Sequence, residues 1–425
     1  MTGILKVRLE IKGKFVEVGK LLCEGANRAR FVYNDKYLAQ EYAAPMSVNL
    51  PLQEKPFSYE KTEIYFEGLL PEGFTRRSVA QWLKVNEDDY LEILQGLGAE
   101  CLGAVQVIDK DYKEVSHYEK LSVTEVKKLA KEGAMKTASL MMETHLSLAG
   151  ASGKAGLYYD GKKWYLPKGL AASTHIVKQS HVRLKHIVAN EQLCLLTAKK
   201  LGIKTVDSFI LNLGEGTEGD ILFATKRYDR SMDNIKQIFD GLPCPLRLHQ
   251  EDFAQALGIG SKNKYEQDND FYLPKLFTLL RAVSSNPLED VQELWKRIIF
   301  NYIIGNNDGH IKNYSLLYSD DLKSIRLAPA YDIISTTVYE QGSKNLSMAF
   351  GSESRIDKVS MDDILQAAHE AGLGKVMAKN VFETMKENFT KALRESALEL
   401  QQEGFSEVKS LSRKILKTGG IAYWD

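Results

Sequence analysis

Two aspartates and one asparagine in the second half of the chain most constrain what it can fold into. Asp308 and Asn313 stand in the polar stretch Gly-Asn-Asn-Asp-Gly-His-Ile-Lys-Asn (305–313), and Asp332 follows 24 positions after Asp308 (332 − 308 = 24). A fold that uses these three side chains together must bring two separate segments to one place. The alternative is a polar loop between two strands, with no chemical role.

Phosphoryl transfer needs groups of this kind. One aspartate accepts the proton of the attacking hydroxyl, and an asparagine and a second aspartate hold Mg²⁺ on the nucleotide phosphates. The order Asp-x₄-Asn and then Asp is that of a protein-kinase catalytic loop and its metal-binding aspartate. We therefore expect Asp308 to be the catalytic base, and Asn313 and Asp332 to hold Mg²⁺ in an ATP site. Because the usual His-Arg-Asp and Asp-Phe-Gly sequences are missing, the pattern predicts an atypical kinase.

Two further candidate nucleotide-binding residues lie inside this stretch, beside Asn313. His310 reads as a zinc ligand, a second base or a residue that hydrogen-bonds within the loop. We favour the last, because no second His or Cys stands at ligand spacing and the chain has only 8 histidines. Lys312 either contacts the γ-phosphate or is solvated, and the sequence leaves both open.

The bulk composition is that of an ordinary globular enzyme. The 425 residues suffice for two or three domains, with 44% hydrophobic and 26% charged residues. Equal numbers of basic and acidic residues, 56 of each, argue against a protein whose whole surface binds nucleic acid. The sequence has no apolar run long enough for a membrane span and no signal-peptide block at its start. The four scattered cysteines, without a Cys-x-x-Cys pair, favour a reducing cytoplasm.

The first 112 residues read as a small α+β domain. Apolar and polar side chains alternate over residues 5–11, which predicts a β-hairpin with residues 15–18. Residues 57–98 predict helices that stop at glycines. The other strands predicted in this domain lie at residues 30–33, 47–52 and 104–108.

The rest of the chain reads as a β-rich lobe (113–230) followed by a helical lobe (231–425). A charged stretch at residues 109–120 reads as the linker before them. The helical lobe includes a long helix at 376–403, whose apolar stripe faces a core. The β-rich lobe has predicted strands at residues 156–159, 164–167, 175–178, 208–213 and 221–228, and a helix at 188–201. The sequence therefore predicts an α+β protein, in which a small N-terminal domain accompanies an atypical two-lobed kinase core with ATP between the lobes.

Small residues at positions 150–155 (Gly-Ala-Ser-Gly-Lys-Ala) predict a turn whose backbone N–H groups approach phosphate oxygens. The turn is not a P-loop, because position 148 is Leu rather than Gly and position 155 is Ala rather than Ser or Thr. The turn supports a phosphate-binding site mainly because it lies just before the strand that carries Lys178. The candidate nucleotide-binding residues of the turn are Ala151, Ser152, Gly153 and Lys154.

Lys178 ends this alternating strand and would place its ammonium on the α- and β-phosphates, whereas an isolated lysine of this kind would be solvated. Glu191, near the start of the next helix, either pairs with Lys178 or is an exposed first-turn acid. Thr225, Lys226 and Tyr228 follow an apolar strand. They would form the hinge, whose backbone groups read adenine while Tyr228 stacks nearby.

Several stretches together resemble the HipA family of bacterial toxin kinases. Residues 304–316 and 327–332 are similar to its catalytic segment, and residues 146–151 to its serine-bearing glycine loop. The chain departs from the family pattern at Ser152, where glutamine is usual, and at Lys226, where an acidic residue is common. Further similar stretches lie at residues 45–52, 66–72, 175–178, 226–230 and 250–255, so the resemblance covers nearly the whole chain.

The resemblance implies a serine/threonine kinase that is the toxin of a HipA–HipB type toxin–antitoxin pair. Its substrate would be a translation-related protein, with aminoacyl-tRNA synthetases as the known class, and its action would arrest growth. Its partner would be a helix-turn-helix antitoxin, through which the pair reaches DNA indirectly and represses its own operon. The resemblance also implies autophosphorylation of Ser147, with Ser152 as the second candidate, after which the loop leaves the nucleotide site.

Two other functions remain open. The chain is either mainly a co-repressor that holds the antitoxin on DNA, or a small-molecule kinase of similar fold. The intact set of Lys178, Asp308, Asn313 and Asp332 argues against the co-repressor. The N-terminal domain and the serine of the glycine loop argue against the small-molecule kinase.

Overall fold

The computed structural model of this chain describes residues 2–110, 112, 115–144, 147–149, 153–180, 184–266, 270–340 and 343–424. Its contacts divide the chain into two compact units. Unit 1 comprises Met1–Gln179, Ala224–Ser261 and Leu316–Ile325, and unit 2 comprises Ser180–Phe223, Lys262–Ser315 and Arg326–Asp425. Each unit is described by itself. The domain boundaries near residues 112 and 230 stay predictions.

Unit 1 begins with a four-stranded antiparallel sheet of order β3-β2-β1-β4. The predicted hairpin is confirmed. Leu5, Val7 and Leu9 are buried while Lys6 and Arg8 between them are partly exposed, so one face of β1 packs on a core. The strands are β1 (Thr2–Ile11), β2 (Lys14–Gly25), β3 (Arg28–Tyr33) and β4 (Val105–Ile108).

The helices predicted over residues 57–98 are also confirmed. Asp89 caps the last of them by accepting the N–H groups of Leu91 and Glu92, and Gly98 follows its end. The rings of Phe31 and Phe66 lie 5.7 Å apart, where the helices cover the sheet. The helices of this part are α1 (Asp35–Leu38), α2 (Tyr59–Glu67), α3 (Gly73–Leu83) and α4 (Tyr90–Leu97).

The strand predicted at residues 47–52 is wrong. Ser47 and Leu50 form an isolated bridge, and the N–H of Leu50 donates to the Ser47 carbonyl in a turn. The buried carboxylate of Glu251 accepts the Ser47 hydroxyl and the Val48 N–H, so these donors are not available for a strand ladder.

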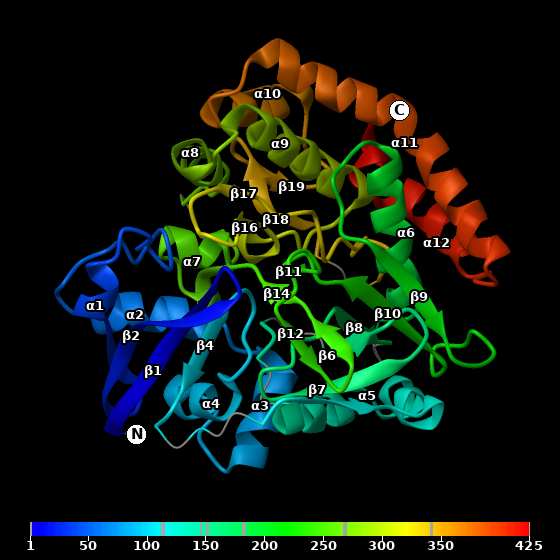
Figure 1. Ribbon diagram of the computed structural model, residues 1–425. Helices are drawn as coiled ribbons and strands as arrows, with labels where there is room; N and C mark the ends of the chain where they lie inside the picture. Colours follow the sequence, from blue (N-terminus) through cyan, green and yellow to red (C-terminus); the bar gives the residue numbers. More distant parts are fainter. Residues whose placement is uncertain are drawn as a thin grey trace. The chain divides into compact units, whose positions relative to one another are not determined.

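A six-stranded sheet follows, with the order β5-β7-β6-β8-β10-β9. The strands predicted here are confirmed, but the last four residues of the predicted linker form an additional strand, β5. The sequence analysis made no prediction for the long helix α5, which packs across β6, β7 and β8 (Figure 1). The elements are β5 (His117–Lys120), α5 (Val123–Thr144), β6 (Lys154–Tyr159), β7 (Trp164–Lys168), β8 (His175–Gln179), β9 (Ser208–Asn212) and β10 (Ile221–Lys226).

The expectation that helices dominate from residue 231 onward is wrong for the first 20 or so residues. Two-stranded pairs β11-β14 and β12-β13 and the sheet β15-β16-β17 form instead. The predicted helix start near residue 250 is confirmed, because Asp252 and Gln255 form a capping box. The elements are β11 (Arg230–Ser231), β12 (Gln237–Phe239), β13 (Leu242–Cys244), β14 (Leu246–Arg247), β15 (Gln250–Asp252), α7 (Phe253–Leu257), η1 (Ser261–Asn263), β16 (Ser315–Tyr318) and β17 (Ile325–Leu327).

Unit 2 is mainly helical. The long helix α11, orange in Figure 1, runs along α6, α9 and α12. Its stripe of buried residues, including Phe382 and Phe389, confirms that the apolar face belongs to a core. The elements are α6 (Ile187–Lys200), α8 (Leu273–Val283), α9 (Pro287–Ile304), η2 (Ile311–Asn313), β18 (Asn345–Phe350), β19 (Glu353–Arg355), α10 (Met361–Glu370), α11 (Lys375–Gln402), α12 (Val408–Thr418) and η3 (Gly420–Tyr423).

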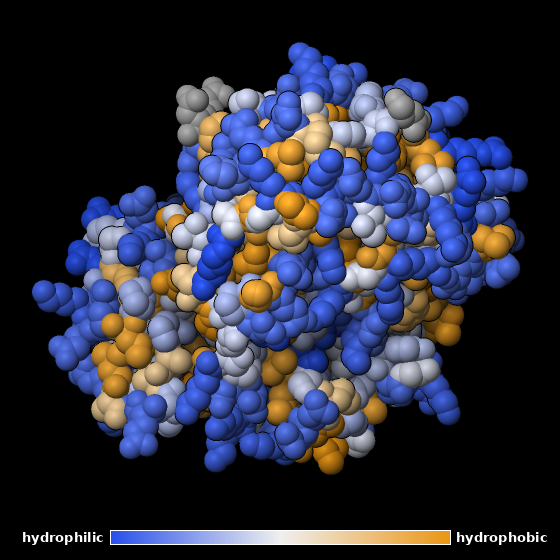
Figure 2. Space-filling view, turned by 90° about the horizontal axis from the view of Figure 1, so that it is seen from above, coloured by the Kyte–Doolittle hydropathy of each residue, from blue (hydrophilic) through white to orange (hydrophobic). Residues whose placement is uncertain are grey.

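The two units together confirm the α+β class, with a β-rich part and a helical part. The face in Figure 2 is mostly hydrophilic, and its hydrophobic side chains form small scattered patches. Among the described residues, no helix is both long enough and apolar enough to cross a membrane.

Candidate active site

The catalytic stretch of unit 2 begins where α9 ends. Gly305 caps that helix with a φ of +72°, and a Cβ at this position would overlap the Thr337 hydroxyl. Its carbonyl accepts the N–H of Thr336 at 2.9 Å. Glycine is therefore required here, both by the left-handed backbone and by the close approach of a second segment.

The structure brings Asp308 and Asn313 together. The Asn313 amide Nδ2 donates to the Asp308 carbonyl at 3.0 Å, and the His310 N–H donates to the same carbonyl at 2.8 Å. Because its nitrogen is used in this way, Asn313 has its Oδ1 left as the atom that can face a cation. This second bond is made by the backbone of His310, so the predicted role of its imidazole within the loop stays a prediction.

The second segment is tied to the first through neighbours of the candidate ligands. The Tyr331 hydroxyl is 2.6 Å from Ser315 Oγ and donates to the Lys312 carbonyl at 3.1 Å. Tyr331 precedes Asp332, and Lys312, which is buried, precedes Asn313. The two predicted metal ligands are therefore on backbone segments that a single tyrosine side chain connects.

Asp332 has a φ of +55°, in the left-handed region that non-glycine residues seldom adopt. Such backbone conformations cost roughly 1–3 kcal/mol and gather at functional sites, where the surrounding structure enforces them. A contact with α6 holds the same segment three residues further on. The Asn190 amide donates to the Ser335 carbonyl at 2.9 Å and accepts the Ser335 N–H at 3.1 Å.

Sequence reasoning missed Asn190, because an asparagine inside a helix gives no sign of its distant partner. Its neighbour Glu191 is buried in α6, so the reading of Glu191 as an exposed first-turn acid is wrong. The pairing of Glu191 with Lys178 stays a prediction.

Tyr265 is a second residue of this site that the sequence did not reveal. Its hydroxyl donates to Asp308 Oδ1 at 2.5 Å, and its ring meets the His310 ring edge to face at 5.3 Å. The two residues of the hydrogen bond are 43 positions apart, in a stretch without a recognisable motif. Only the folded chain shows that this phenol lies on the predicted base.

The described residues of the predicted glycine-rich turn, together with Lys178, lie in unit 1. Lys154 begins β6 and is paired directly with Lys178 in β8, which is buried. Residues directly opposite in an antiparallel pair point to the same face. Two ammonium groups on one face suit a polyanion such as a nucleotide. Gly153 precedes this pair, while Ala151 and Ser152 lie outside the described residues.

The predicted hinge of unit 1 lies at the end of β10, with Thr225 and Lys226 as the last two residues of the strand and Tyr228 just after it. Thr225 is buried, Lys226 is exposed, and the half-buried Tyr228 donates its hydroxyl to Gln250 Oε1. Arg227 between them is buried and donates to both carboxylate oxygens of Asp229, at 2.9 and 2.7 Å. The hinge backbone is thus fixed by a side chain that the sequence analysis had not singled out.

Arg227 belongs to a buried group of charges in unit 1. Glu100 Oε1 lies 3.0 Å from Arg230, 3.7 Å from Arg227 and 3.9 Å from Arg247. Burial by itself would raise the pKa of Glu100, but the three guanidinium groups outweigh it and hold the pKa below its usual value. The group stays charged and joins the hinge to the loop before β4.

Ser147 is adjacent to this group. It is fully buried, its hydroxyl donates to the Leu69 carbonyl at 2.6 Å, and its N–H donates to the Glu100 carbonyl at 2.7 Å. Ser147 therefore has no exposed surface in this conformation. A phosphate can reach its oxygen only after both hydrogen bonds open.

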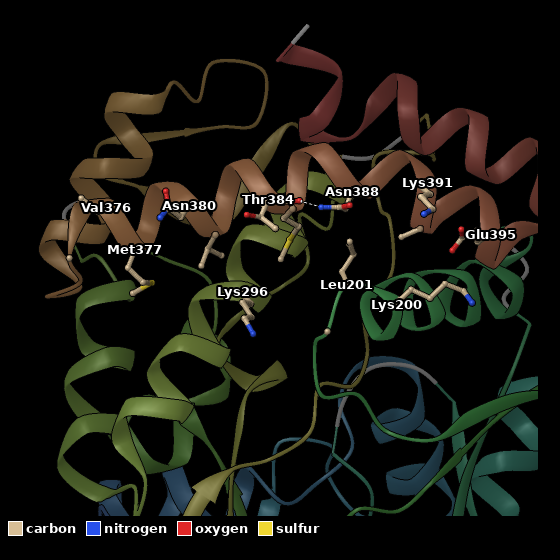
Figure 3. A pocket seen from close by; sticks show the side chains of 15 residues that line it. Lys200, Leu201, Lys296, Val376, Met377, Asn380, Thr384, Asn388, Lys391 and Glu395 are labelled. Atoms are coloured by element: carbon tan, nitrogen blue, oxygen red, sulfur yellow. Dashed lines mark hydrogen bonds between the residues drawn. The ribbon is translucent and has the colours of Figure 1, made fainter.

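A groove of about 1030 Å³ lies elsewhere in unit 2, between α11, α9 and the end of α6 (Figure 3). Met377 and Leu201 contribute to its apolar lining, with Lys296 and Lys391 among the polar groups. It contains none of the residues of the catalytic stretch, so we do not assign the predicted chemistry to it.

Comparison with known proteins agrees with this geometry. Residues 146–393 match the model of the HipA-like C-terminal domain, and residues 9–108 match the model of the HipA N-terminal domain. The protein Y4mE of Sinorhizobium fredii is 32% identical over 352 residues, which are 81% of this chain and 81% of that protein. The serine/threonine-protein kinase toxin HipA of Shewanella oneidensis is 28% identical over 348 residues, 79% of this chain and 76% of that protein.

A solved structure shares the fold over almost the full length. It is a chain of the Shewanella oneidensis toxin–antitoxin complex of HipA, HipB and operator DNA, with a TM-score of 0.79 at 22% identity. The match covers 97% of this chain and 96% of that chain. The C-terminal family model alone spans more than half of the sequence, and so the chain belongs to the HipA family of protein kinases.

Proposed function

We propose that this chain is an ATP- and Mg²⁺-dependent serine/threonine protein kinase, the toxin of a HipA–HipB type toxin–antitoxin pair. The observation that carries the proposal is the hydrogen bond from Asn313 to the Asp308 carbonyl. It folds the Asp-x₄-Asn stretch into one compact loop. The link from Tyr331 to Lys312 adds Asp332 to the same part of unit 2.

The donor set fits a hard cation. Asn313 Oδ1 and the Asp332 carboxylate are oxygen ligands of the kind that Mg²⁺ takes alongside phosphate oxygens and water. Mg²⁺–ATP, when bound, supplies the phosphoryl group and neutralises its developing charge. Asp308 accepts the proton of the acceptor hydroxyl. Lys154 and Lys178 contact the phosphates, and the backbone at Thr225–Tyr228 reads adenine, with His310 and Lys312 beside the phosphates.

The toxin role rests on the relatives. Shewanella oneidensis HipA carries the name of a serine/threonine-protein kinase toxin, and its solved complex contains HipB and operator DNA. For this chain we propose a helix-turn-helix antitoxin as partner and DNA contact only through that antitoxin. We further propose a cytoplasmic location and a translation-related protein substrate, such as an aminoacyl-tRNA synthetase, whose phosphorylation arrests growth.

Radiolabelled phosphate transfer from Mg²⁺–ATP tests the proposal. Asp308→Asn should abolish transfer and leave nucleotide binding nearly unchanged, because a general base acts only on the acceptor hydroxyl. Asp332→Asn should instead weaken Mg²⁺–ATP binding, as asparagine tolerates the positive φ but is a weaker cation ligand.

Asp207→Asn is the matched control, since it makes the same chemical change in an exposed ion pair of unit 2. It should keep wild-type transfer. Normal transfer by Asp308→Asn would remove Asp308 from the mechanism. Binding of a HipB-type protein without any phosphate transfer by the wild type would favour the co-repressor function instead.

A further inference from the structure

The phenol of Tyr265 lies where a kinase needs its acceptor. Its Oη donates a proton to Asp308 Oδ1 at 2.5 Å, which is the contact that the hydroxyl of a protein substrate must make with its general base. An oxygen already bonded there excludes another oxygen from the same lone pair.

The segment that carries Tyr265 is anchored on both sides. Next to it, the Glu266 carboxylate accepts the N–H groups of Tyr272 and Ala349, both at 2.7 Å. Before it, the Asn263 carbonyl accepts the Tyr272 hydroxyl at 2.6 Å. These bonds fix residues 263–266 to the start of α8 and to β18, so the position of the phenol is set by the fold of unit 2.

The side chain of Tyr265 is accessible to a protein substrate. Tyr265 is 41% exposed, although it is a large aromatic residue. Its ring contacts are an edge-to-face contact with His310 and the Lys264 ammonium at 5.5 Å from the ring centre. Rotation about χ1 breaks these contacts without disturbing the anchored backbone.

We propose that Tyr265 is an acceptor gate, whose hydroxyl occupies the acceptor position on Asp308 until the serine or threonine of a protein substrate displaces it. This inference rests on the proposed role of Asp308 as the base. The gate also protects ATP from water. In hydrolysis, a water oxygen bonds to the γ-phosphorus, the bond from that phosphorus to the β–γ bridging oxygen breaks, and Asp308 takes the proton while ADP leaves. With the phenol in place, Oδ1 of Asp308 is already bonded, so a water must displace the phenol to take its position.

The test is release of inorganic phosphate from saturating Mg²⁺–ATP by the full chain without a protein acceptor. Tyr265→Phe keeps the ring and its packing on His310 but removes the hydroxyl. It should raise kcat for phosphate release by about 10- to 100-fold, because a hydrogen bond to a charged group has to be broken only in the wild type. The KM for ATP should not change, because the variant keeps every predicted nucleotide-binding residue, and the melting temperature should fall by no more than a few degrees, because one hydrogen bond is lost.

Tyr59→Phe is the matched control. Tyr59 also donates to a carboxylate, that of Glu24, at 2.5 Å, but on an exposed surface of unit 1. It should leave phosphate release as in the wild type. An unchanged or lower kcat in Tyr265→Phe overturns the gate, a lower value meaning that the phenol positions Asp308 for catalysis. The proposed function is judged separately by wild-type release above that of Asp308→Asn. Without that difference, the proposed function fails and the gate fails with it.

Discussion

Lys154 stands directly opposite Lys178 in the antiparallel pair of β6 and β8, and the Lys178 side chain is buried. Like charges in this arrangement destabilise a sheet by a few tenths of a kcal/mol up to about 1 kcal/mol. A buried ammonium adds a desolvation cost, which a bound polyanion offsets. The pair is therefore better suited to a liganded protein than to an empty one.

Lys178→Met should consequently affect the stability of the nucleotide-free protein and the binding of Mg²⁺–ATP differently. Loss of the like-charge contact with Lys154 should favour the variant without nucleotide by a few tenths of a kcal/mol up to about 1 kcal/mol, and loss of any partner of Lys178 acts against this gain. The variant should lose most of the rise in melting temperature that Mg²⁺–ATP gives the wild type. Thermal denaturation with and without Mg²⁺–ATP measures both effects. Lys162→Met, at an exposed turn of the same sheet, should behave as the wild type. Full nucleotide stabilisation of Lys178→Met would exclude Lys178 from the phosphate site.

Asn190→Ala should both destabilise the fold and impair catalysis. It leaves the buried N–H and carbonyl of Ser335 without their two partners, at a cost of roughly 1–3 kcal/mol. Because Ser335 lies three residues after Asp332, the Mg²⁺–ATP KM should rise as well. Urea denaturation and initial-rate kinetics measure the two changes. Asn388→Ala removes an exposed amide of α11, which bonds only to Thr384, and serves as the control. A destabilised Asn190→Ala with unchanged KM would mean that Asn190 does not position Asp332.

The sequence predicted the parts of this fold that rest on local patterns. The alternation from Leu5 to Ile11 was enough for the hairpin, and the Asp-x₄-Asn spacing was enough to find a loop that closes on itself. It did not predict the strands between residues 230 and 252. These strands have two or three residues each, which is too short for an alternating pattern in the sequence. Their pairing depends on tertiary contacts.

The same limit applies to the site. Tyr265 bonds to Asp308 across 43 positions, and Asn190 bonds to Ser335 across 145 positions. Neither bond has a periodic or spacing signal in the sequence. Glu191 shows another limit, because the sequence left open whether it is an exposed first-turn acid or a buried partner, and the structure buries it beyond the first turn of α6.

Glu251 should make unit 1 less stable as the pH rises. The carboxyl is fully buried, and this burial raises its pKa to about 7, although Ser47, Tyr318 and the Val48 N–H donate to it. The folded state therefore holds a proton that the unfolded state has released between pH 4.5 and about 7, and stability falls across that window. At about 1.4 kcal/mol per pKa unit, the loss is roughly 3 kcal/mol.

Glu251→Gln removes this titration while keeping the size and most hydrogen bonds of the side chain. Its free energy of unfolding should equal that of the wild type near pH 4.5 and exceed it at pH 8. Denaturation series at both pH values measure the difference, with the exposed Glu41→Gln as control. Parallel pH dependences of Glu251→Gln and the wild type would contradict a raised pKa at Glu251.

Ser147 should be phosphorylated slowly and from an opened state. Its hydroxyl is fully buried and bonded to the Leu69 carbonyl, so the reaction must wait until this bond and the bond to Glu100 open. Once attached, a phosphate of about −1.5 to −2 charge cannot return to the buried position of the hydroxyl, which donates to the Leu69 carbonyl and would place negative charge against it. Incubation with Mg²⁺–ATP should therefore yield a Ser147 phosphopeptide, and the modified protein should bind nucleotide more weakly. Ser147→Ala removes the acceptor and should keep its nucleotide affinity during the same incubation. A protein that is active on another substrate, yet shows no phosphate on Ser147 or Ser152 by mass spectrometry, would exclude this self-inactivation and leave the kinase assignment intact.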